Sequence, residues 1–232
     1  MEDGETIVDF GCGPGYVATH LCRLVGPTGH VHAVDVNESF LARTRELADE
    51  SGQGDQITVH HCPDEQIPLD EGAADRVYAK NVLEYVPDLD RVLAELYRTL
   101  RVGGRMVASD SDFGFVVIEP LAPTEITELF DAAAPAFKEP NVGRKLRAAY
   151  QRAGFVDVDV AVTAAVDTTG RMRGVIENML GYGLNFGRIT EGRATELRAR
   201  VDQAINDGTY LAVLPQWWVT GTKAGVLLGD QP

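Results

Sequence analysis

The feature that most constrains this chain is a short apolar strand that ends in an acid and runs into a glycine-rich turn. Residues 7–15 read Ile-Val-Asp-Phe-Gly-Cys-Gly-Pro-Gly. Glycines at alternate positions let the backbone approach a ligand without Cβ collisions. The helix predicted from Tyr16 onwards directs its first N–H groups at the same place. The segment therefore predicts a site for a charged small-molecule cofactor with an anionic group, a phosphate or a carboxylate.

The spacing of the glycines argues against two common nucleotide motifs. A dinucleotide fingerprint needs a third glycine at position 16, where Tyr16 stands, and a P-loop needs Gly-Lys-Ser/Thr, which is absent from this turn. A second predicted strand, residues 31–36, contains Asp35, which is placed to accept hydrogen bonds from two ribose hydroxyls. Asp35 alone does not separate a nicotinamide cofactor from S-adenosylmethionine.

Strands and helices alternate along the first half of the chain. The hydrophobic pattern predicts strands at residues 7–10, 31–36, 56–60, 76–79 and 105–109, with helices at 16–22, 40–48 and 90–100 between them. Gly103 and Gly104 are expected to end the third helix before the fifth strand. A helix at 141–153 and strands at 155–163 and 217–223 complete the pattern. This alternation is typical of an α/β fold with a doubly wound, mostly parallel sheet.

With these motifs in place, the chain resembles the class I S-adenosylmethionine-dependent methyltransferases, in the branch of the ubiquinone/menaquinone C-methyltransferases and many natural-product methyltransferases. The resemblance is carried by residues 8–15, Asp35, residues 67–86 and residues 100–107, and it extends over most of the chain. It implies a seven-stranded Rossmann-like sheet whose last strand is antiparallel. It also implies S-adenosylmethionine as the cofactor and S-adenosylhomocysteine as the product.

The resemblance further implies the residues that hold the cofactor. Asp9 and Gly11 are expected near the methionine amino group, Asp35 at the ribose, Asp64 near the adenine and Asn81 beside the methionine portion. The expected cofactor set is Asp9, Gly11, Cys12, Gly13, Gly15, Asp35, Val36, Pro63, Asp64 and Asn81. Each polar member has a simpler alternative: a capping acid for Asp9, a surface acid for Asp35 and a turn former for Asn81.

The chain departs from the family pattern at two places, which affects the assignment of these cofactor residues. Where relatives usually read Asp-Ala-Glu, this chain reads Pro63-Asp64-Glu65, which displaces the adenine-side acid by one position. Relatives also usually carry one or more helices before the first strand, whereas here that strand begins almost at Met1. The chain is therefore expected either to be a short version of the family or to lack a segment.

Two segments are too long to be simple connections, because hairpin loops usually hold about two to five residues. Residues 164–215 are expected to form two helices, at 172–180 and 194–205, separated by the glycine-rich stretch 181–187. Residues 119–140 form a shorter insertion. We expect one methyltransferase domain over residues 1–232, with 119–140 and 164–215 as substrate-capping insertions. The residues expected to contact the substrate are Tyr16, Tyr182, Phe186 and Trp217.

Catalytic candidates are sought where parallel strands end, because open α/β sheets bind ligands there. Asp112 follows the fifth predicted strand and Tyr85 the fourth. An oxygen nucleophile needs a proton acceptor, whereas an amine can react without one. Asp112 and Tyr85 are the two candidates for that role; the alternatives are a hydrogen-bonded turn at 110–112 and simple packing of the tyrosine.

The bulk properties restrict the partners. The chain has 21 Lys and Arg against 35 Asp and Glu, a formal charge of −14, which repels phosphate backbones and argues against a nucleic-acid substrate. There is no signal-peptide pattern and no apolar run of membrane length, so we expect a soluble, cytoplasmic protein. A homodimer is its expected assembly if it is not a monomer. Three cysteines without zinc spacing and adjacent His60 and His61, which point to opposite faces of a strand, predict no metal site.

The leading hypothesis is methyl transfer from S-adenosylmethionine to an O, N or C atom of a small, partly apolar molecule such as a secondary metabolite. One alternative keeps the fold and the cofactor but uses them for non-methylating chemistry or ligand binding. A less favoured alternative is a nicotinamide-dependent oxidoreductase, which lacks both the third glycine and a Tyr-x-x-x-Lys pair.

Overall fold

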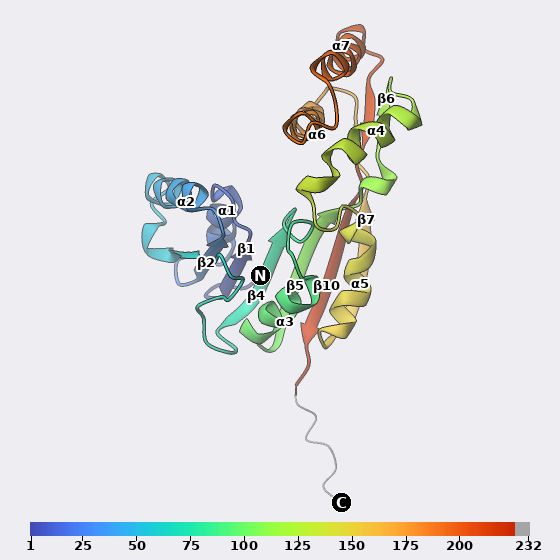
Figure 1. Ribbon diagram of the computed structural model, residues 1–232. Coiled ribbons are helices and arrows are strands. Elements are labelled where there is room, and N and C mark those ends of the chain that lie inside the picture. The colour runs from blue at the N-terminus through green and yellow to red at the C-terminus, as the bar shows by residue number, and fades with distance from the viewer. Residues whose placement is uncertain (226–232) are drawn as a thin grey trace, which may run out of the picture. The chain divides into compact units, whose positions relative to one another are not determined.

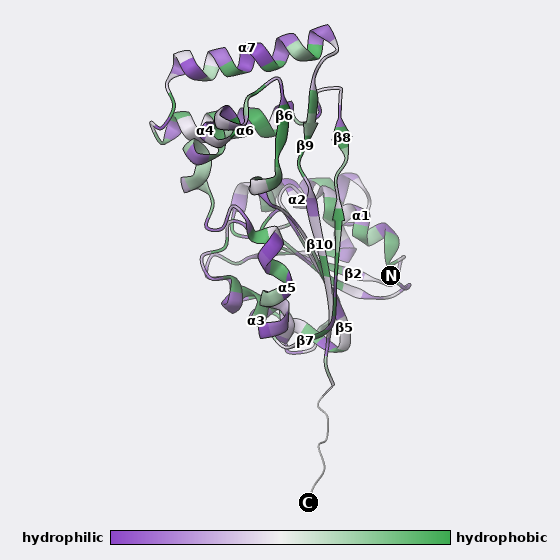
Figure 2. Ribbon diagram, turned by 90° about the vertical axis from the view of Figure 1, so that its right-hand side faces the viewer, coloured by the Kyte–Doolittle hydropathy of each residue, from purple (hydrophilic) through white to green (hydrophobic). Residues whose placement is uncertain are grey.

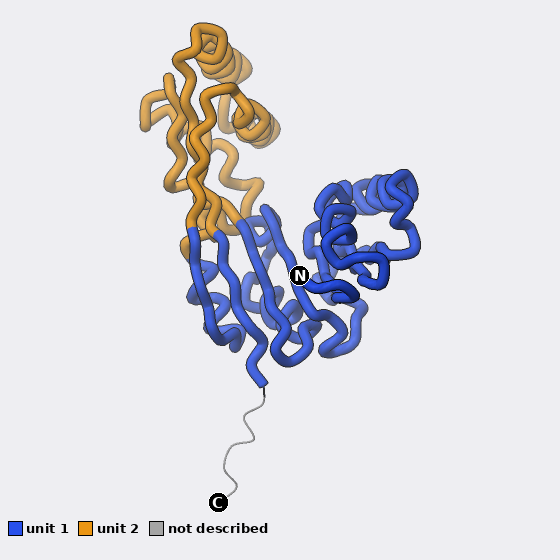
Figure 3. Tube along the Cα trace, turned by 180° about the vertical axis from the view of Figure 1, so that it is seen from behind, with its two compact units in different colours: residues 1–109, 145–161, 218–232 blue, residues 110–144, 162–217 orange. Residues whose placement is uncertain are grey.

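The computed structural model describes residues 1–225, and the chain within it divides into two compact units (Figure 3). Unit 1 comprises Met1–Ser109, Lys145–Ala161 and the chain from Trp218 onwards, and unit 2 comprises Asp110–Arg144 and Val162–Trp217. Both segments that the sequence marks as insertions, 119–140 and 164–215, fall inside unit 2. The two insertions therefore belong to one compact body.

A seven-stranded sheet forms the framework of unit 1 (Figure 1). Its strands are β1 (Thr6–Phe10), β2 (His30–Asp35), β3 (Ile57–His61), β4 (Ala74–Lys80), β5 (Leu100–Ser111), β7 (Phe155–Thr163) and β10 (Gln216–Lys223). They lie in the order β3-β2-β1-β4-β5-β10-β7. The neighbours from β3 to β5 pair in parallel, and one strand of the sheet is antiparallel. This confirms the expected doubly wound, mostly parallel fold.

Among the described residues, four α-helices belong wholly or partly to unit 1, and a capping side chain precedes two of them. They are α1 (Tyr16–Leu24), α2 (Glu38–Glu50), α3 (Leu89–Thr99) and α5 (Val142–Arg152), which starts in unit 2; a short 3₁₀ turn, η1, spans Gly54–Gln56. The Asn37 side chain accepts hydrogen bonds from the first N–H groups of α2, and Asp88 does the same for α3. The apolar faces of α1 and α2 pack on β1 and β2 around Ile7 and Val31. These contacts fix the turn between β1 and α1.

The fifth strand is longer than the sequence predicts. Helix α3 ends at Thr99, and β5 begins directly at Leu100, so Gly103 and Gly104 lie inside the strand. Gly103 has φ +76°, and the pairing with β4 changes register between Ala74 and Arg76. A Cβ on Gly104 would lie 2.9 Å from the carbonyl oxygen of Asp75. The two glycines therefore serve an irregular strand pairing and not the end of a helix, which corrects the expectation.

Unit 2 has its own small sheet and its own core. Strands β6 (Val117–Glu119), β9 (Leu211–Val213) and β8 (Val166–Asp167) pair antiparallel in that order. Helices α4 (Pro123–Ala133), α6 (Arg173–Asn185) and α7 (Glu191–Asp207), with the 3₁₀ turns η2 (Phe113–Phe115) and η3 (Ala134–Ala136), complete the unit. Figure 2 shows α7 mostly in the hydrophilic colour, interrupted by apolar bands. The buried residues of α7, Ala194, Leu197, Val201 and Ala204, join the core of this unit.

The glycine-rich stretch 181–187 is not the linker that the sequence predicts. Helix α6 continues to Asn185, so Gly181 and Gly183 are helical, and only Gly187 has a positive φ, +65°. Gly183 is a packing position, because a Cβ there would lie 2.8 Å from Cγ2 of Ile189. The expectation that a helix ends before this stretch is wrong, because tertiary packing outweighs the low helix propensity of glycine.

Candidate functional site

The turn between β1 and α1 is held in a conformation that requires glycine. Gly11, Gly13 and Gly15 have φ values of +73°, +53° and +87°. A Cβ on Gly11 would collide with the Val82 side chain, and one on Gly15 would lie 2.8 Å from Cγ2 of Thr44. A Cβ on Gly13 would meet nothing within 4 Å. Two of the glycines therefore allow close packing, and the third faces open space where a ligand can approach.

Thr44 anchors this turn, a role that the sequence reasoning missed. Its Oγ1 donates a hydrogen bond to the carbonyl oxygen of Gly13 at 2.9 Å. The same Oγ1 lies 3.0 Å from the carbonyl oxygen of Phe40, one turn earlier in α2. The residue is fully buried. A threonine inside a helix usually bonds its own backbone, so nothing in the sequence pattern marks this one as a support for the turn.

Asp35 connects the end of β2 to the glycine turn. Its Oδ2 accepts a hydrogen bond from the backbone N–H of Gly13 at 2.9 Å, and its Oδ1 accepts one from the N–H of Asn37 at 2.9 Å. Within residues 1–225, no cation forms an ion pair with this carboxylate. The side chain is partly exposed and lines a cavity. Asp35 is thus oriented by backbone donors and not by a cation.

Asp9 is a buried acid beside the same turn. Its exposed fraction is 2%, and its Oδ2 has no hydrogen-bond partner within the described part of the chain. Burial raises the pKa of Asp9 to about 7, and the charge of Asp35 adds to the shift. Burial likewise raises the pKa of the Cys12 thiol, which leaves Cys12 as a small packing residue. A buried carboxyl with an unused oxygen fits a ligand that brings a positive charge.

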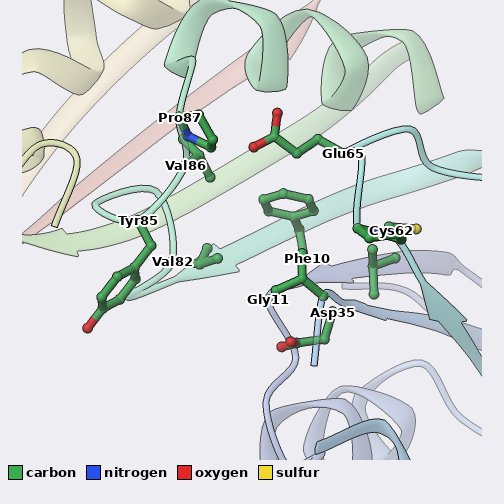
Figure 4. A pocket seen from close by; sticks show the side chains of 12 residues that line it. Phe10, Gly11, Asp35, Cys62, Glu65, Val82, Tyr85, Val86 and Pro87 are labelled. Carbon is green, nitrogen blue, oxygen red and sulfur yellow. The ribbon is translucent and has the colours of Figure 1, made fainter. Parts of the chain in front are cut away.

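A cavity of about 300 Å³ opens beside Asp35 (Figure 4). Phe10 stands at its centre, with Asp35 at one end and the Glu65 carboxylate at the other. The lining residues are Phe10, Gly11, Val34, Asp35, Val36, Cys62, Pro63, Glu65, Val82, Tyr85, Val86 and Pro87. Apolar walls with two carboxylates suit a molecule that has a flat apolar part and several hydroxyl or amine donors.

Two residues expected to bind the cofactor, Asp64 and Asn81, are exposed and do not line this cavity. Asp64 is exposed and is not among the residues that line the cavity; its Oδ1 accepts from the N–H of Gln66 at 3.3 Å. The neighbouring Glu65, at φ +63°, lines the cavity instead. Asn81 is also exposed, at φ +51°, and its N–H donates to the carbonyl oxygen of Ser109 at 2.9 Å. Glu65 is the acid that the displaced Pro63-Asp64-Glu65 motif could have indicated.

The two catalytic candidates have unlike environments. Tyr85 lines the cavity and is 40% exposed, with its phenol oxygen directed away from Phe10 (Figure 4). Asp112, in unit 2, is fully buried and is held by the guanidinium of Arg144, with Oδ1 2.6 Å from Nη2, and by the N–H of Gly114 at 3.0 Å. Sequence reasoning missed Arg144. The role of either residue as a base stays a prediction.

The four expected substrate residues are distributed over both units. Tyr16 is the first residue of α1 and is 66% exposed. Tyr182 is half-buried and meets Phe137 edge to face, with ring centroids 5.9 Å apart. Phe186 is exposed at the end of α6, and Trp217 packs beside Phe115. Tyr16 belongs to unit 1 and the other three to unit 2.

Residues 1–225 contain no group of three or more His, Cys, Asp or Glu side chains arranged to hold a metal ion. In the same range no helix is both long and apolar enough to span a membrane.

The sequence matches a known family over its first half. A family described as methyltransferase domain matches residues 8–108, which contain the glycine turn, Asp35 and Asn81. The ubiquinone/menaquinone biosynthesis C-methyltransferase UbiE of Escherichia coli is 33% identical over 119 residues, which cover 51% of this chain and 47% of that enzyme. An uncharacterized 37.1 kDa protein in transposon TN4556 of Streptomyces fradiae is 25% identical over 224 residues, 96% of this chain and 59% of that protein. The chain spans about half the length of these relatives.

Solved structures share the fold at low identity. The YcgJ protein from Bacillus subtilis has a TM-score of 0.66 at 14% identity, covering 97% of this chain and 94% of that one. Geranyl diphosphate C-methyltransferase from Streptomyces coelicolor A3(2), solved with Mg²⁺, geranyl diphosphate and S-adenosyl-L-homocysteine, has a TM-score of 0.58 at 18% identity, covering 96% and 74%. At these identities the similarity establishes the fold.

Proposed function

We propose that the chain belongs to the class I S-adenosylmethionine-dependent methyltransferases and that it transfers a methyl group from S-adenosylmethionine to an O, N or C atom of a small molecule. The observation that carries this proposal is the glycine turn, whose Gly13 faces open space and donates its N–H to Asp35. The turn and the acid are linked by a hydrogen bond, so the two halves of the site are held together before any ligand binds.

The residues around the turn suit the parts of this cofactor. Asp35 would accept hydrogen bonds from the ribose hydroxyls, because its two oxygens are already oriented by backbone donors. Asp9 would receive the methionine ammonium, which supplies the positive charge that its unused oxygen lacks. Val36, Pro63 and Glu65 line the cavity where the adenine would lie. We keep Cys12, Asp64 and Asn81 as members of this site only as predictions.

The cofactor carries the reactive group, so the protein mainly binds and orients. When bound, S-adenosylmethionine supplies an electrophilic methyl on its sulfonium. Unit 1 has to fix that sulfonium, and a second site has to hold the acceptor and exclude water. We assign the acceptor to unit 2, since both insertions, 119–140 and 164–215, belong to that unit, which has a core of its own. The capping role of residues 119–140 and 164–215 is part of this proposal.

A small molecule is the favoured acceptor class. The formal charge of −14 disfavours a nucleic acid, and the solved S. coelicolor relative is named for geranyl diphosphate. Tyr85 and Asp112 remain the candidates for a base, and Asp112 would have to act while bound to Arg144. In the alternative, non-methylating chemistry on the same cofactor, unit 1 would bind the cofactor through the same contacts. Only the molecule that unit 2 binds, and the reaction there, would differ.

Calorimetric titration tests the proposal directly. S-adenosylhomocysteine should bind with a stoichiometry of about one, whereas NAD should not bind at the same concentration, because Tyr16 stands where a dinucleotide site needs glycine. Transfer of tritium from methyl-labelled S-adenosylmethionine to a metabolite extract then separates methylation from other uses of the cofactor. No binding of S-adenosylhomocysteine at millimolar concentration would end the proposal.

A further inference from the structure

Unit 2 contains a cavity of about 450 Å³ that is separate from the cofactor turn and is built entirely from residues 113–141. It lies between the segment that carries η2 and β6 and the helix α4 that follows. Its lining residues are Phe113, Gly114, Val116, Val117, Glu119, Leu121, Pro123, Ile126, Thr127, Phe130, Asp131, Ala134, Pro140 and Asn141. The volume is enough for a molecule with a bicyclic ring.

One wall of this cavity is aromatic and well supported. The Phe113 ring lies 5.0 Å from that of Phe130 and 4.9 Å from that of Phe137, measured between ring centroids. Phe137 is buried, while Phe113 and Phe130 are partly exposed and pack against the core of unit 2. Ile126 adds an aliphatic surface on α4. Because the rings brace one another, this wall offers a preformed apolar face to a ligand.

The charged side chains among the residues that line the cavity are all negative. Glu119 and Asp131 line it, and its lining set contains no Lys, Arg or His. Neither carboxylate has an ion pair or a side-chain hydrogen bond within residues 1–225. Three arginines lie near the cavity without pairing with either carboxylate. Arg188 donates to the backbone carbonyl of Asp131 at 3.3 Å, Arg200 pairs with Glu125 and donates to the carbonyl oxygen of Pro120 at 2.9 Å, and Arg144, beside Gly114, pairs with Asp112.

We propose that this cavity binds a small molecule with an apolar ring body and a protonated amine, and that it excludes phosphorylated compounds. The ring would lie on the Phe113 and Phe130 face, and the ammonium would be attracted by Glu119 and Asp131. An anionic group such as a diphosphate would instead be repelled by both carboxylates. The assignment of this ligand as the methyl acceptor rests on the proposed function, whereas its binding does not.

Three probes with the same ring and different charge test the inference: tryptamine, the neutral tryptophol and the anionic indole-3-propionate. Each is titrated calorimetrically into the full chain at pH 7.5. We expect tryptamine to bind about tenfold more tightly than indole-3-propionate, with tryptophol between them, because two exposed carboxylates act through screened attraction.

Variants locate the effect in this cavity. Glu119→Gln combined with Asp131→Asn should reduce the preference for tryptamine to about twofold and leave tryptophol affinity unchanged. Asp207→Asn, which removes a charge at the end of α7 outside the cavity, is the control and should change nothing. Thr127→Trp, at an exposed lining position, should weaken all three probes by filling the space. Native circular dichroism establishes that each variant is folded.

The outcomes separate this inference from the proposed function. Equal affinity for the three probes, or a tryptamine preference that survives the double variant, overturns the inference. If S-adenosylhomocysteine binds and tryptamine does not, the cavity assignment falls and methyl transfer stands. If tryptamine binds with the expected preference and S-adenosylhomocysteine does not bind, the reverse holds.

Discussion

Two acids that follow strands of the same sheet are held in opposite ways. Among the described residues 1–225, the donors to Asp35, at the end of β2 in unit 1, are the backbone N–H groups of Gly13 and Asn37. Asp112, which follows β5 in unit 2, is fully buried against the guanidinium of Arg144. Backbone donors orient a carboxylate and leave its charge in place, whereas an arginine neutralises it.

From this difference we expect Asp35 to bind a ligand and Asp112 to stabilise the fold. A ligand that meets Asp35 gains hydrogen bonds without breaking an ion pair, but a ligand that meets Asp112 competes with Arg144. From the sequence the two acids look alike, because each follows an apolar strand of an α/β pattern. The contrast predicts that changes around Asp35 affect ligand affinity and that changes around Asp112 affect stability.

The largest effect is expected for Gly13→Val. A branched side chain there would occupy the open space at the turn and resist φ +53°, so S-adenosylhomocysteine affinity should fall by at least about 100-fold in calorimetric titration. Gly52→Val is a matched control, because Gly52 also has a positive φ, +69°, and open surroundings. Both variants should lose about 1–3 kcal/mol of stability to backbone strain. Equal ligand affinity in the two variants would contradict a binding role for the turn.

The second test breaks the ion pair in unit 2. Arg144→Ala leaves the buried Asp112 without its counter-charge and should lower the free energy of unfolding by about 3 kcal/mol, the lower end for buried pairs, because Arg144 is 44% exposed. Arg152→Ala removes an exposed pair with Asp90 and should cost at most about 1 kcal/mol. Chemical denaturation measures both. A loss of S-adenosylhomocysteine binding in a folded Arg144→Ala protein would show that the contrast between the two acids is wrong.

The third test removes the binding acid. Asp35→Ala should weaken S-adenosylhomocysteine binding by about 1.5–3 kcal/mol, the range for hydrogen bonds to a charged group, with a small change in the unfolding free energy. Asp55→Ala removes the same charge from an exposed position in η1 and serves as the control. If both variants bind the ligand equally well, Asp35 is not part of the site.

The sequence predicted those features of the fold and the site that depend on residues close together in the chain. The strand-turn-helix at residues 7–24 and an acid, Asp35, at the end of the second strand follow from spacing and glycine chemistry over a few residues, and the structure has both. The role of Asp35 at a ribose stays a prediction. Arg144, which lies 32 residues from Asp112, forms its ion pair only through the fold. The small sheet of unit 2 is equally inaccessible, because β8 has only two residues and carries no periodicity.

The fourth test uses pH. With its pKa raised to about 7, Asp9 is protonated in the free protein below that pH and has to lose the proton to pair with the ligand ammonium. S-adenosylhomocysteine affinity should therefore fall by up to about tenfold per pH unit as the pH drops below 7. Asp9→Asn should flatten the profile. An unchanged profile in a folded Asp9→Asn protein would assign the titration to another group.

Binding is the right readout for Asp9, because two groups of unit 1 affect stability with opposite sign. The native Asp9 keeps a proton that the unfolded chain releases above its ordinary pKa of 3.8, so its contribution to stability decreases as the pH rises towards 7. Burial lowers the pKa of His32 from 6.5 to about 4, so its contribution decreases as the pH falls through that window. His32→Asn should reduce the second slope in denaturation experiments but not remove it, because burial lowers the pKa of His30 and His60 in the same direction.

The smallest effects are expected from the two aromatic residues of α6, and they test whether unit 2 acts on the acceptor alone. Phe186 is 46% exposed, so Phe186→Ala should change the unfolding free energy by less than about 0.5 kcal/mol. Tyr182→Ala removes the edge-to-face contact with Phe137 and should cost about 1 kcal/mol. If unit 2 closes over the acceptor, both variants should leave S-adenosylhomocysteine affinity unchanged and reduce methyl transfer, measured as tritium incorporated from labelled S-adenosylmethionine. A parallel loss of cofactor affinity and thermal stability would mean that these rings only pack, and the division of labour between an orienting unit 1 and an acceptor-binding unit 2 would have to be given up.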